Sequence, residues 1–300
     1  MITKKQELPC PLCDSTNYHA LYEPIVQEND PLKLYGAASG LPGVQRLVVC
    51  DNCGLIYENP RFTEDVIVQA YKSSKEAGHD SQHAMRVASF HWALKRHARF
   101  LPPKGARVLD VGTAGGAYLD AAVRFGYDAF GLEPSLDLVQ RGKKRGLQIE
   151  QGTINNHGFE PESFDMVSFW DVIEHIPNPR AALRETKKLL KPNGILLLNY
   201  PDIGTWQAKL AGRRFWWILS VHLQHFTPKT IATLCRVSGF EPFHFQRYWQ
   251  LLQFGYLEHM AIHYKMPLAA ILTKLTPDFI QRIPIPYYAS QTTMLARITK

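Results

Sequence analysis

Four cysteines stand in two pairs at a spacing that suits a single metal ion. Cys10 and Cys13 belong to "CPLC", and Cys50 and Cys53 belong to "CDNC". Two thiols that are two residues apart in a tight turn can reach the same tetrahedral zinc ion, and two such turns complete a set of four sulfur ligands. Because protein would fill all four positions, we predict a structural zinc ion. The alternative is four unrelated buried or oxidisable thiols.

A glycine-rich turn is the second feature with chemical potential. The stretch "VLDVGTAGGAYLD", residues 108–120, runs from an apolar strand through glycines into a helical pattern. The dinucleotide-binding turn G-x-G-x-x-G would need glycine at Ala114 and Ala117. Asp110, just before the glycines, suits an ammonium or sulfonium group better than a pyrophosphate. We therefore predict a ligand other than a dinucleotide; the alternative role of Asp110 is to cap the following turn.

A second carboxylate stands where it could contact a ribose. Glu133 ends the next predicted strand, 21 positions after Gly112. From this place a carboxylate can accept hydrogen bonds from both ribose hydroxyls. We predict an adenosine-containing ligand, with an exposed acid at a strand end as the alternative.

Strands and helices alternate from residue 105 onward, and this order must position those groups. Such alternation predicts an α/β fold, with a parallel sheet, helices on both faces and ligands at the carboxyl ends of the strands. We expect the rim of the site at residues 110–116, Glu133, Gly152, Asp171 and Tyr200. The expected strands are residues 106–112, 127–133, 147–152, 163–172, 195–201, 240–250 and 292–300, and the expected helices are residues 81–105, 115–126, 135–146, 179–194 and 227–240.

Four motifs together resemble the class I S-adenosylmethionine-dependent methyltransferases. They are "VLDVGTAGGAYL", "GLEPS", "SFDMVSFWDVIEHIPNPRAAL" and "LKPNGILLLNYPD", within residues 105–240. The resemblance implies a Rossmann-like seven-stranded sheet whose last strand is antiparallel. It also implies S-adenosylmethionine as cofactor, with its methionine part near the turn, its ribose at Glu133 and its adenine near Gly152 and Thr153. The turn residues concerned are Gly112, Thr113 and Gly116; the family commonly has glycine where Ala114 stands.

Histidines and carboxylates follow the fourth strand and the fifth. "DVIEH" would put Asp171, Glu174 and His175 over the site, and the resemblance implies that this loop lies beside the cofactor, with Asp171 among the cofactor-binding residues. The alternative for Glu174 and His175 is that they only order the loop by hydrogen bonding. Residues 201–226 form a connector that we expect to cross the carboxyl edge without a helix until Thr227 caps the next one. We predict His225 as the base that accepts a hydroxyl proton, with His222 and His175 behind it; a packing role is the alternative.

Composition and charge bound the remaining questions. The 300 residues are 45% hydrophobic and 20% charged, which fits a globular chain with a real core. We expect a zinc-ribbon module at 1–62, a helical linker at 63–104 and the methyltransferase domain at 105–300, with a lid at 201–226 and an insertion at 251–288. No window of about 18 apolar residues and no leader pattern occurs, so we expect a cytoplasmic protein.

Three functions remain open at this stage. The first is methyl transfer to a small-molecule or glycan acceptor, at a hydroxyl oxygen. The second is methylation of ribosomal RNA, with the ribbon and the net charge of +7 binding RNA, although the ribbon has no clustered Lys or Arg. The third is a non-catalytic cofactor-binding protein that docks other proteins. For the insertion we expect helices that enlarge the acceptor site or join two copies, with peripheral membrane contact as a further alternative.

Overall fold

A twisted sheet of seven strands forms the centre of the molecule. The computed structural model describes residues 5–36, 40–73, 83–254, 277, 280 and 283–299. The strand order is β10-β11-β8-β7-β4-β5-β6, and β11 alone runs antiparallel to its neighbours. The strands are β4 (Arg107–Val111), β5 (Asp128–Glu133), β6 (Gln148–Gln151), β7 (Phe164–Trp170), β8 (Leu190–Pro201), β10 (Phe240–Gln253) and β11 (Pro284–Ile298). The predicted seven-stranded Rossmann-like sheet is therefore confirmed.

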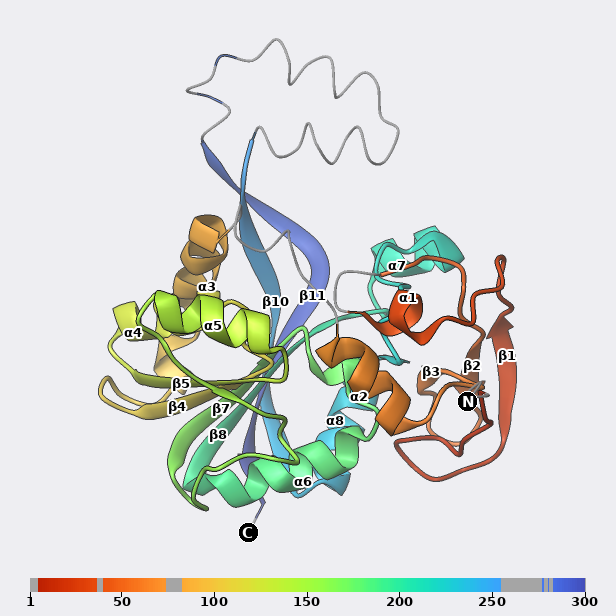
Figure 1. Cartoon of the computed structure of the whole chain (residues 1–300), viewed down its shortest axis with the longest axis horizontal. Coiled ribbons are helices and arrows are strands. Elements are labelled where there is room, and N and C mark those ends of the chain that lie inside the picture. Colours follow the sequence, from red (N-terminus) through yellow and green to blue (C-terminus); the bar gives the residue numbers. More distant parts are fainter. Residues whose placement is uncertain are drawn as a thin grey trace.

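Helices cover both faces of this sheet, and each face has its own core (Figure 1). On one face α3 (His83–His97), α4 (Ala117–Phe125) and α5 (Leu136–Lys144) bury Phe90, Tyr118 and Val139. On the other face α6 (Pro179–Leu189) and α8 (Pro228–Val237) bury Leu183 and Leu234. Because β4 and β7 are covered on both sides, most of their residues are apolar and buried, apart from Arg107, Asp110, Asp165 and Ser168.

The amino-terminal module forms a second, four-stranded sheet that includes part of the connector. Its order is β1 (Tyr18–Tyr22), β2 (Leu47–Cys50), β3 (Ile56–Glu58) and β9 (Gln224–His225). Two helices complete the module, α1 (Pro31–Tyr35) and α2 (Glu64–Lys72). The strand β9 belongs to the connector, which follows β8 of the seven-stranded sheet. One continuous stretch of chain therefore runs from that sheet into the sheet of the amino-terminal module.

Gln45 strengthens this link. Its side chain is 4% exposed, and its Nε2 donates to the backbone oxygens of Ser220 and His222, each at 3.0 Å. Both acceptors belong to the connector, 175 and 177 positions away in the chain. The amino-terminal module thus fixes the backbone that carries His222.

Several predicted boundaries are wrong; the last strand, β11, begins at Pro284, within the predicted insertion, and not at Thr292. The connector contains a short helix, α7 (Trp206–Ala211), followed by the 3-10 turn η3 (Gly212–Arg214), where no helix was expected before Thr227. Thr205 accepts a hydrogen bond from the Ala208 amide, which satisfies one of the orphan donors at the start of α7. The helix predicted at 179–194 ends at Leu189, because the chain after it already pairs as β8 with β7.

Other local predictions are confirmed. Thr227 and Thr230 form a capping box at the start of α8, and Pro228 occupies its first turn. Cys235 is fully buried in the core.

The segment 83–100, predicted as part of a linker, forms α3 and the 3-10 turn η1 (Ala98–Phe100), and α3 packs against α4 and β10. Most of the predicted insertion at 251–288 lies outside the described residues.

We expect Gln45→Ala to destabilise the protein. The variant removes both donated hydrogen bonds and leaves two buried carbonyl oxygens without that donor, at about 1–3 kcal/mol for an unsatisfied buried group. In urea denaturation we expect the free energy of unfolding to fall by about 2 kcal/mol. Gln148→Ala is the matched control, because Gln148 is exposed and donates only to Asp128. Equal losses in both variants would contradict the linking role of Gln45.

Candidate active site

The glycine turn has the backbone conformation that its sequence indicates. Gly112 has a φ of 69° and Gly116 a φ of 83°, in the left-handed region that side chains rarely adopt. A Cβ atom on Gly112 would lie 2.7 Å from Cγ2 of Val172, and one on Gly116 would overlap Leu147. Both positions therefore require glycine, the first for close approach to the loop after β7 and the second for entry into α4.

Ala114 is the residue that departs from the family pattern, and Glu133 compensates for it. Ala114 has a φ of 50°, which costs an alanine about 1–2 kcal/mol. Its amide donates to Oε2 of Glu133 at 3.0 Å, and the Ser135 amide donates to Oε1 at 2.9 Å. Glu133 is fully buried, so these bonds hold the turn against the end of β5. Glu133 is not among the residues that line the two cavities described below, although Leu132 and Pro134 beside it line the larger one.

Asp110 is a buried carboxyl group at the end of β4. It is 2% exposed and accepts a hydrogen bond from Ser168 Oγ at 2.8 Å. Burial raises its pKa from 3.8 to about 7, while hydrogen bonds from Ser168 and Thr113 lower the pKa in part. A cationic group that binds beside this carboxyl group would stabilise its ionised form and lower its pKa.

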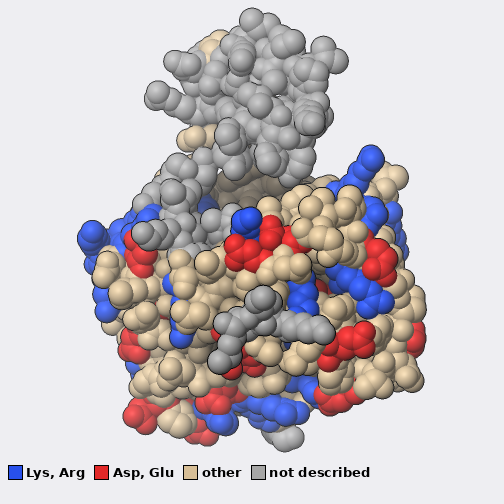
Figure 2. All heavy atoms as spheres, turned by 45° about the vertical axis from the view of Figure 1, so that its right-hand side comes forward, with Lys and Arg blue, Asp and Glu red and all other residues tan. Residues whose placement is uncertain are grey.

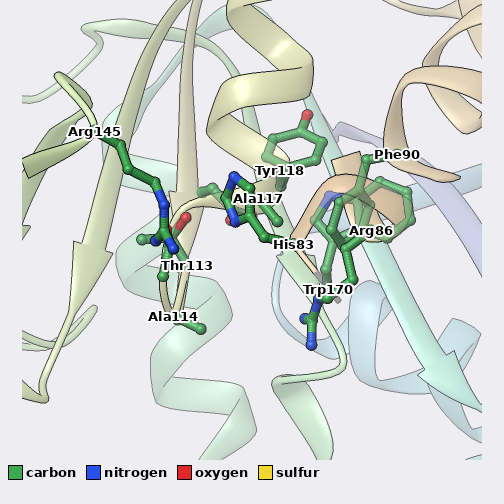
Figure 3. Close-up of a pocket in the computed structure, with 12 residues that line it drawn as sticks. His83, Arg86, Phe90, Thr113, Ala114, Ala117, Tyr118, Arg145 and Trp170 are labelled. Carbon is green, nitrogen blue, oxygen red and sulfur yellow. The ribbon is translucent and has the colours of Figure 1, made fainter. Parts of the chain in front are cut away.

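Arg86 and His83 join this site from α3, and sequence reasoning missed both. Together with Asp110, Thr113 and Ala114 they line a small cavity at the glycine turn (Figure 3). Arg86 also contributes to the electrostatic environment of Asp110 by lowering its pKa. The sequence shows a charged residue, Arg86, among apolar residues at helical spacing. The direction of its side chain, however, depends on how α3 packs on the sheet.

A larger cavity of about 990 Å³ extends from the glycine turn to the connector. One end is formed by Gly112, Ala114, Gly152, Thr153 and Asp171, which sequence analysis placed around the cofactor. The part at the connector is aromatic and polar and includes His175, Trp216, Trp217 and His222, while Trp170 lines both this cavity and the small one at the glycine turn. The connector therefore covers the carboxyl edge, as its length predicted.

The backbone turns sharply at Asp171, directly after β7. Its φ is 56°, and its Oδ1 accepts hydrogen bonds from Asn199 at 2.9 Å and Gln291 at 2.5 Å. Burial raises the pKa of Asp171 to about 6, while Arg86 and the two amides lower it. These bonds anchor the start of the "DVIEH" loop to β8 and β11.

The structure brings the three predicted histidines into one row. The ring centroids of His175 and His222 are 4.7 Å apart, and those of His222 and His225 are 6.2 Å apart. His175 and His222 line the large cavity, whereas His225 is not among its lining residues; it lies in β9, paired with Ile56. Burial lowers the pKa of His222 to about 4 and that of His225 to about 3, so both are neutral at pH 7.

Glu174 lies against this row and is almost fully enclosed. It belongs to the 3-10 turn η2 (Ile173–His175), is 1% exposed, and its backbone oxygen accepts from the Leu223 amide at 2.9 Å. Burial, and then the neighbouring Asp171, raise the pKa of Glu174 well above its usual range.

The four cysteines of the amino-terminal module also come together. The Sγ atoms of Cys10 and Cys53 are 3.6 Å apart, and those of Cys13 and Cys50 are 3.5 Å apart. All four sulfur atoms lie within 4.8 Å of one another, and none forms a disulfide. A tetrahedron with zinc–sulfur bonds of about 2.3 Å has edges of about 3.8 Å, so the spacing fits one such ion.

Comparison with known proteins identifies the class of this fold and site. A family described as "Methyltransferase domain" matches residues 81–244, more than half of the chain. An S-adenosylmethionine-dependent methyltransferase structure from Archaeoglobus fulgidus superposes with a TM-score of 0.51 at 13% identity, covering 74% of this chain and all of that one. The chain belongs to the methyltransferase domain family, and its class is that of the S-adenosylmethionine-dependent methyltransferases.

The curated relatives name a narrower activity for themselves. A ubiquinone biosynthesis O-methyltransferase from Xanthomonas campestris is 33% identical over 124 residues, 39% of this chain and 50% of the relative. One from Proteus mirabilis is 32% identical over 97 residues, 30% of this chain and 40% of the relative. The chain thus spans about half the length of the curated relatives it matches. Among the described residues, no helix combines the length and apolar character that a membrane crossing needs.

The residues at the turn fit the cofactor of this class. S-adenosylmethionine carries a sulfonium and an ammonium group, and either cation beside the buried Asp110 would stabilise its ionised form, which burial disfavours. When bound, the cofactor supplies an electrophilic methyl group. The larger cavity leaves room for an acceptor beyond it, since ligand sites commonly have about 300–1,000 Å³.

We expect Asp110 to make the stability of the ligand-free protein pH-dependent. The folded protein keeps this proton up to about pH 7, whereas the unfolded chain releases it near pH 3.8. Between these values the folded state binds more protons, so its stability falls as the pH rises. Relative to Asp110→Asn, the wild type should lose about 2 kcal/mol of unfolding free energy from pH 5 to pH 7 in urea titrations.

The control for this comparison is Asp128→Asn, at an exposed strand position. Its unfolding free energy should parallel that of the wild type over the same pH range. If the curve of Asp110→Asn is also parallel to that of the wild type, Asp110 does not carry the raised pKa.

Proposed function

We propose that this protein transfers a methyl group from S-adenosylmethionine to a hydroxyl oxygen of a small-molecule or saccharide acceptor. The observation that carries the proposal is the continuous cavity from the glycine turn to Trp217 and His222. One space of that extent accommodates two reactants side by side, which is what direct methyl transfer requires.

At the cofactor end, the proposal assigns a part of S-adenosylmethionine to each wall. Asp110 would face the cationic methionine part, beside Gly112, Thr113 and Gly116. Arg86 would attract the carboxylate of the cofactor, because its positively charged side chain lines both cavities. Gly152 and Thr153 would flank the adenine, and Asp171 would lie beside the cofactor. Glu133 would accept from the ribose, because a carboxylate offers about four lone-pair sites in all.

At the acceptor end, flat aromatic side chains favour a ring-shaped acceptor. Trp216 and Trp217 line the cavity and donate through Nε1 to the Ala289 oxygen, at 3.3 and 2.5 Å, which fixes both rings. Trp206, by contrast, is 67% exposed. The curated relatives are O-methyltransferases, and this supports oxygen as the acceptor atom here.

The histidine row supplies the polar chemistry that a hydroxyl acceptor needs. Neutral imidazoles at the cavity wall can accept a proton from a hydroxyl group that is positioned for attack. His175 and His222 are the groups in reach, and His225 would act through its contact with His222. The prediction that His225 is itself the base stays a prediction.

Charge argues for this function over RNA methylation. On the face shown in Figure 2, basic and acidic side chains are interspersed. Within described residues 5–62, every Lys and Arg has a partner: Lys5 pairs with Glu58, Lys33 with Glu28 and Arg46 with Glu23, while the buried Arg61 donates to the Pro177 oxygen. An RNA-docking module instead needs basic side chains that are free for phosphates.

The same proposal includes a structural zinc ion at Cys10, Cys13, Cys50 and Cys53. We expect one zinc per chain by elemental analysis, lost in Cys50→Ser together with a marked fall in thermal stability, because a structural zinc site contributes folding free energy. Cys235→Ser is the control and should retain the metal, since Cys235 lies in the core apart from the cluster. Full zinc content in Cys50→Ser would contradict the assignment.

Labelled cofactor tests the activity and the acceptor class together. The protein is incubated with S-adenosylmethionine carrying a labelled methyl group and with small-molecule, lipid and RNA fractions of its host. We expect label in the small-molecule fraction and matching release of S-adenosylhomocysteine. Label in RNA would favour the second function. Cofactor binding without S-adenosylhomocysteine release from any fraction would favour a non-catalytic protein.

A further inference from the structure

Three side chains at the acceptor end form a set that could hold a metal ion. Glu174 and His175 come from η2, and His222 comes from the connector. One ligand atom from each of them lies within 4.8 Å of the others. The Leu223 amide donates to the backbone oxygen of Glu174 at 2.9 Å and keeps the two segments in this register.

Glu174 lacks the hydrogen bonds that a buried carboxyl group normally has. It is 1% exposed, and neither side-chain oxygen accepts a hydrogen bond from another described residue. Burial of a carboxylate without a partner costs several kcal/mol. A bound cation between Glu174 and the histidines would supply the missing partner.

His222 is oriented as a metal ligand is. Nδ1 of His222 lies 2.7 Å from the backbone oxygen of Trp217, so it donates there and leaves Nε2 with a free lone pair. Histidines that bind metal almost always donate their other ring nitrogen to such an oxygen, which fixes the tautomer and the ring.

The set of Glu174, His175 and His222 faces the large cavity on one side. His175 and His222 line the large cavity, while Glu174 lies behind them. Asp171 is not part of this set, and its Oδ1 accepts hydrogen bonds from Asn199 and Gln291. An ion held by Glu174, His175 and His222 would therefore have unfilled positions toward the acceptor.

We propose that Glu174, His175 and His222 bind a divalent transition-metal ion whose open positions face the acceptor cavity. A set of two imidazoles and one carboxylate suits first-row divalent metals, whereas magnesium and calcium prefer oxygen ligands. Resting on the proposed function, the ion would bind the acceptor hydroxyl oxygen and favour its deprotonated form, with the proton leaving to water. In that case His175 and His222 assist deprotonation of the hydroxyl through the ion they hold, in place of accepting the proton directly.

Manganese binding tests this site without any acceptor. The probe is Mn²⁺, added to protein whose cysteine cluster already holds zinc and followed by electron paramagnetic resonance. We expect one Mn²⁺ per chain, with nitrogen couplings from imidazole in the spin-echo spectrum of the wild type. Glu174→Gln and His222→Gln should each bind Mn²⁺ about tenfold or more weakly.

The matched control uses the other described His–Glu pair, His157 and Glu185, whose side chains are 3.7 Å apart. His157→Gln should bind Mn²⁺ as the wild type does, and cofactor affinity measured by calorimetry verifies that each variant is folded. A wild-type spectrum without nitrogen coupling, or unchanged Mn²⁺ affinity in folded Glu174→Gln, overturns the proposal. Because no acceptor is present, these outcomes are independent of whether labelled methyl groups reach a hydroxyl acceptor.

Discussion

The pairing of β9 with β3 is the interaction on which the acceptor site depends. It places a segment of the connector in the sheet of the amino-terminal module, and Gln45 adds two hydrogen bonds to the same segment. Without these contacts, the part of the connector after η3, residues 215–226, would be a loop over the carboxyl edge with many conformations. The cysteine cluster brings the turn at Cys10 and Cys13 to the β2–β3 hairpin, whose strand β3 pairs with β9.

Burial of polar groups at the carboxyl edge is the second constraint. Asp110, Asp171 and Glu174 are carboxyl groups with raised pKa values in one region, and each opposes folding when it ionises without a cation nearby. Arg86 offsets part of this charge. This arrangement suits a site whose ligands carry cationic groups, because their binding supplies positive charge beside the three carboxyl groups.

Sequence patterns located most elements because local rules decided them. Mostly apolar runs marked β4 and β7, and Thr227 with Pro228 marked the start of α8. The missed elements depend on contacts between distant segments. The short α7 has no strong periodicity, and the end of α6 at Leu189 follows from the pairing of β8 with β7. Arg86 points into the cofactor region only because α3 packs on α4 and β10.

The sequence by itself determined the class of fold, the grouping of the cysteines and the residues of the glycine turn. Each of these rests on spacing along the chain, which is fixed before any packing occurs. Only the tertiary structure decided which histidines reach the cavity, because His222 and His225 differ by three positions yet only His222 lines it. The strand β9 pairs with β3 and takes His225 into its buried sheet, and that contact joins residues more than 160 positions apart.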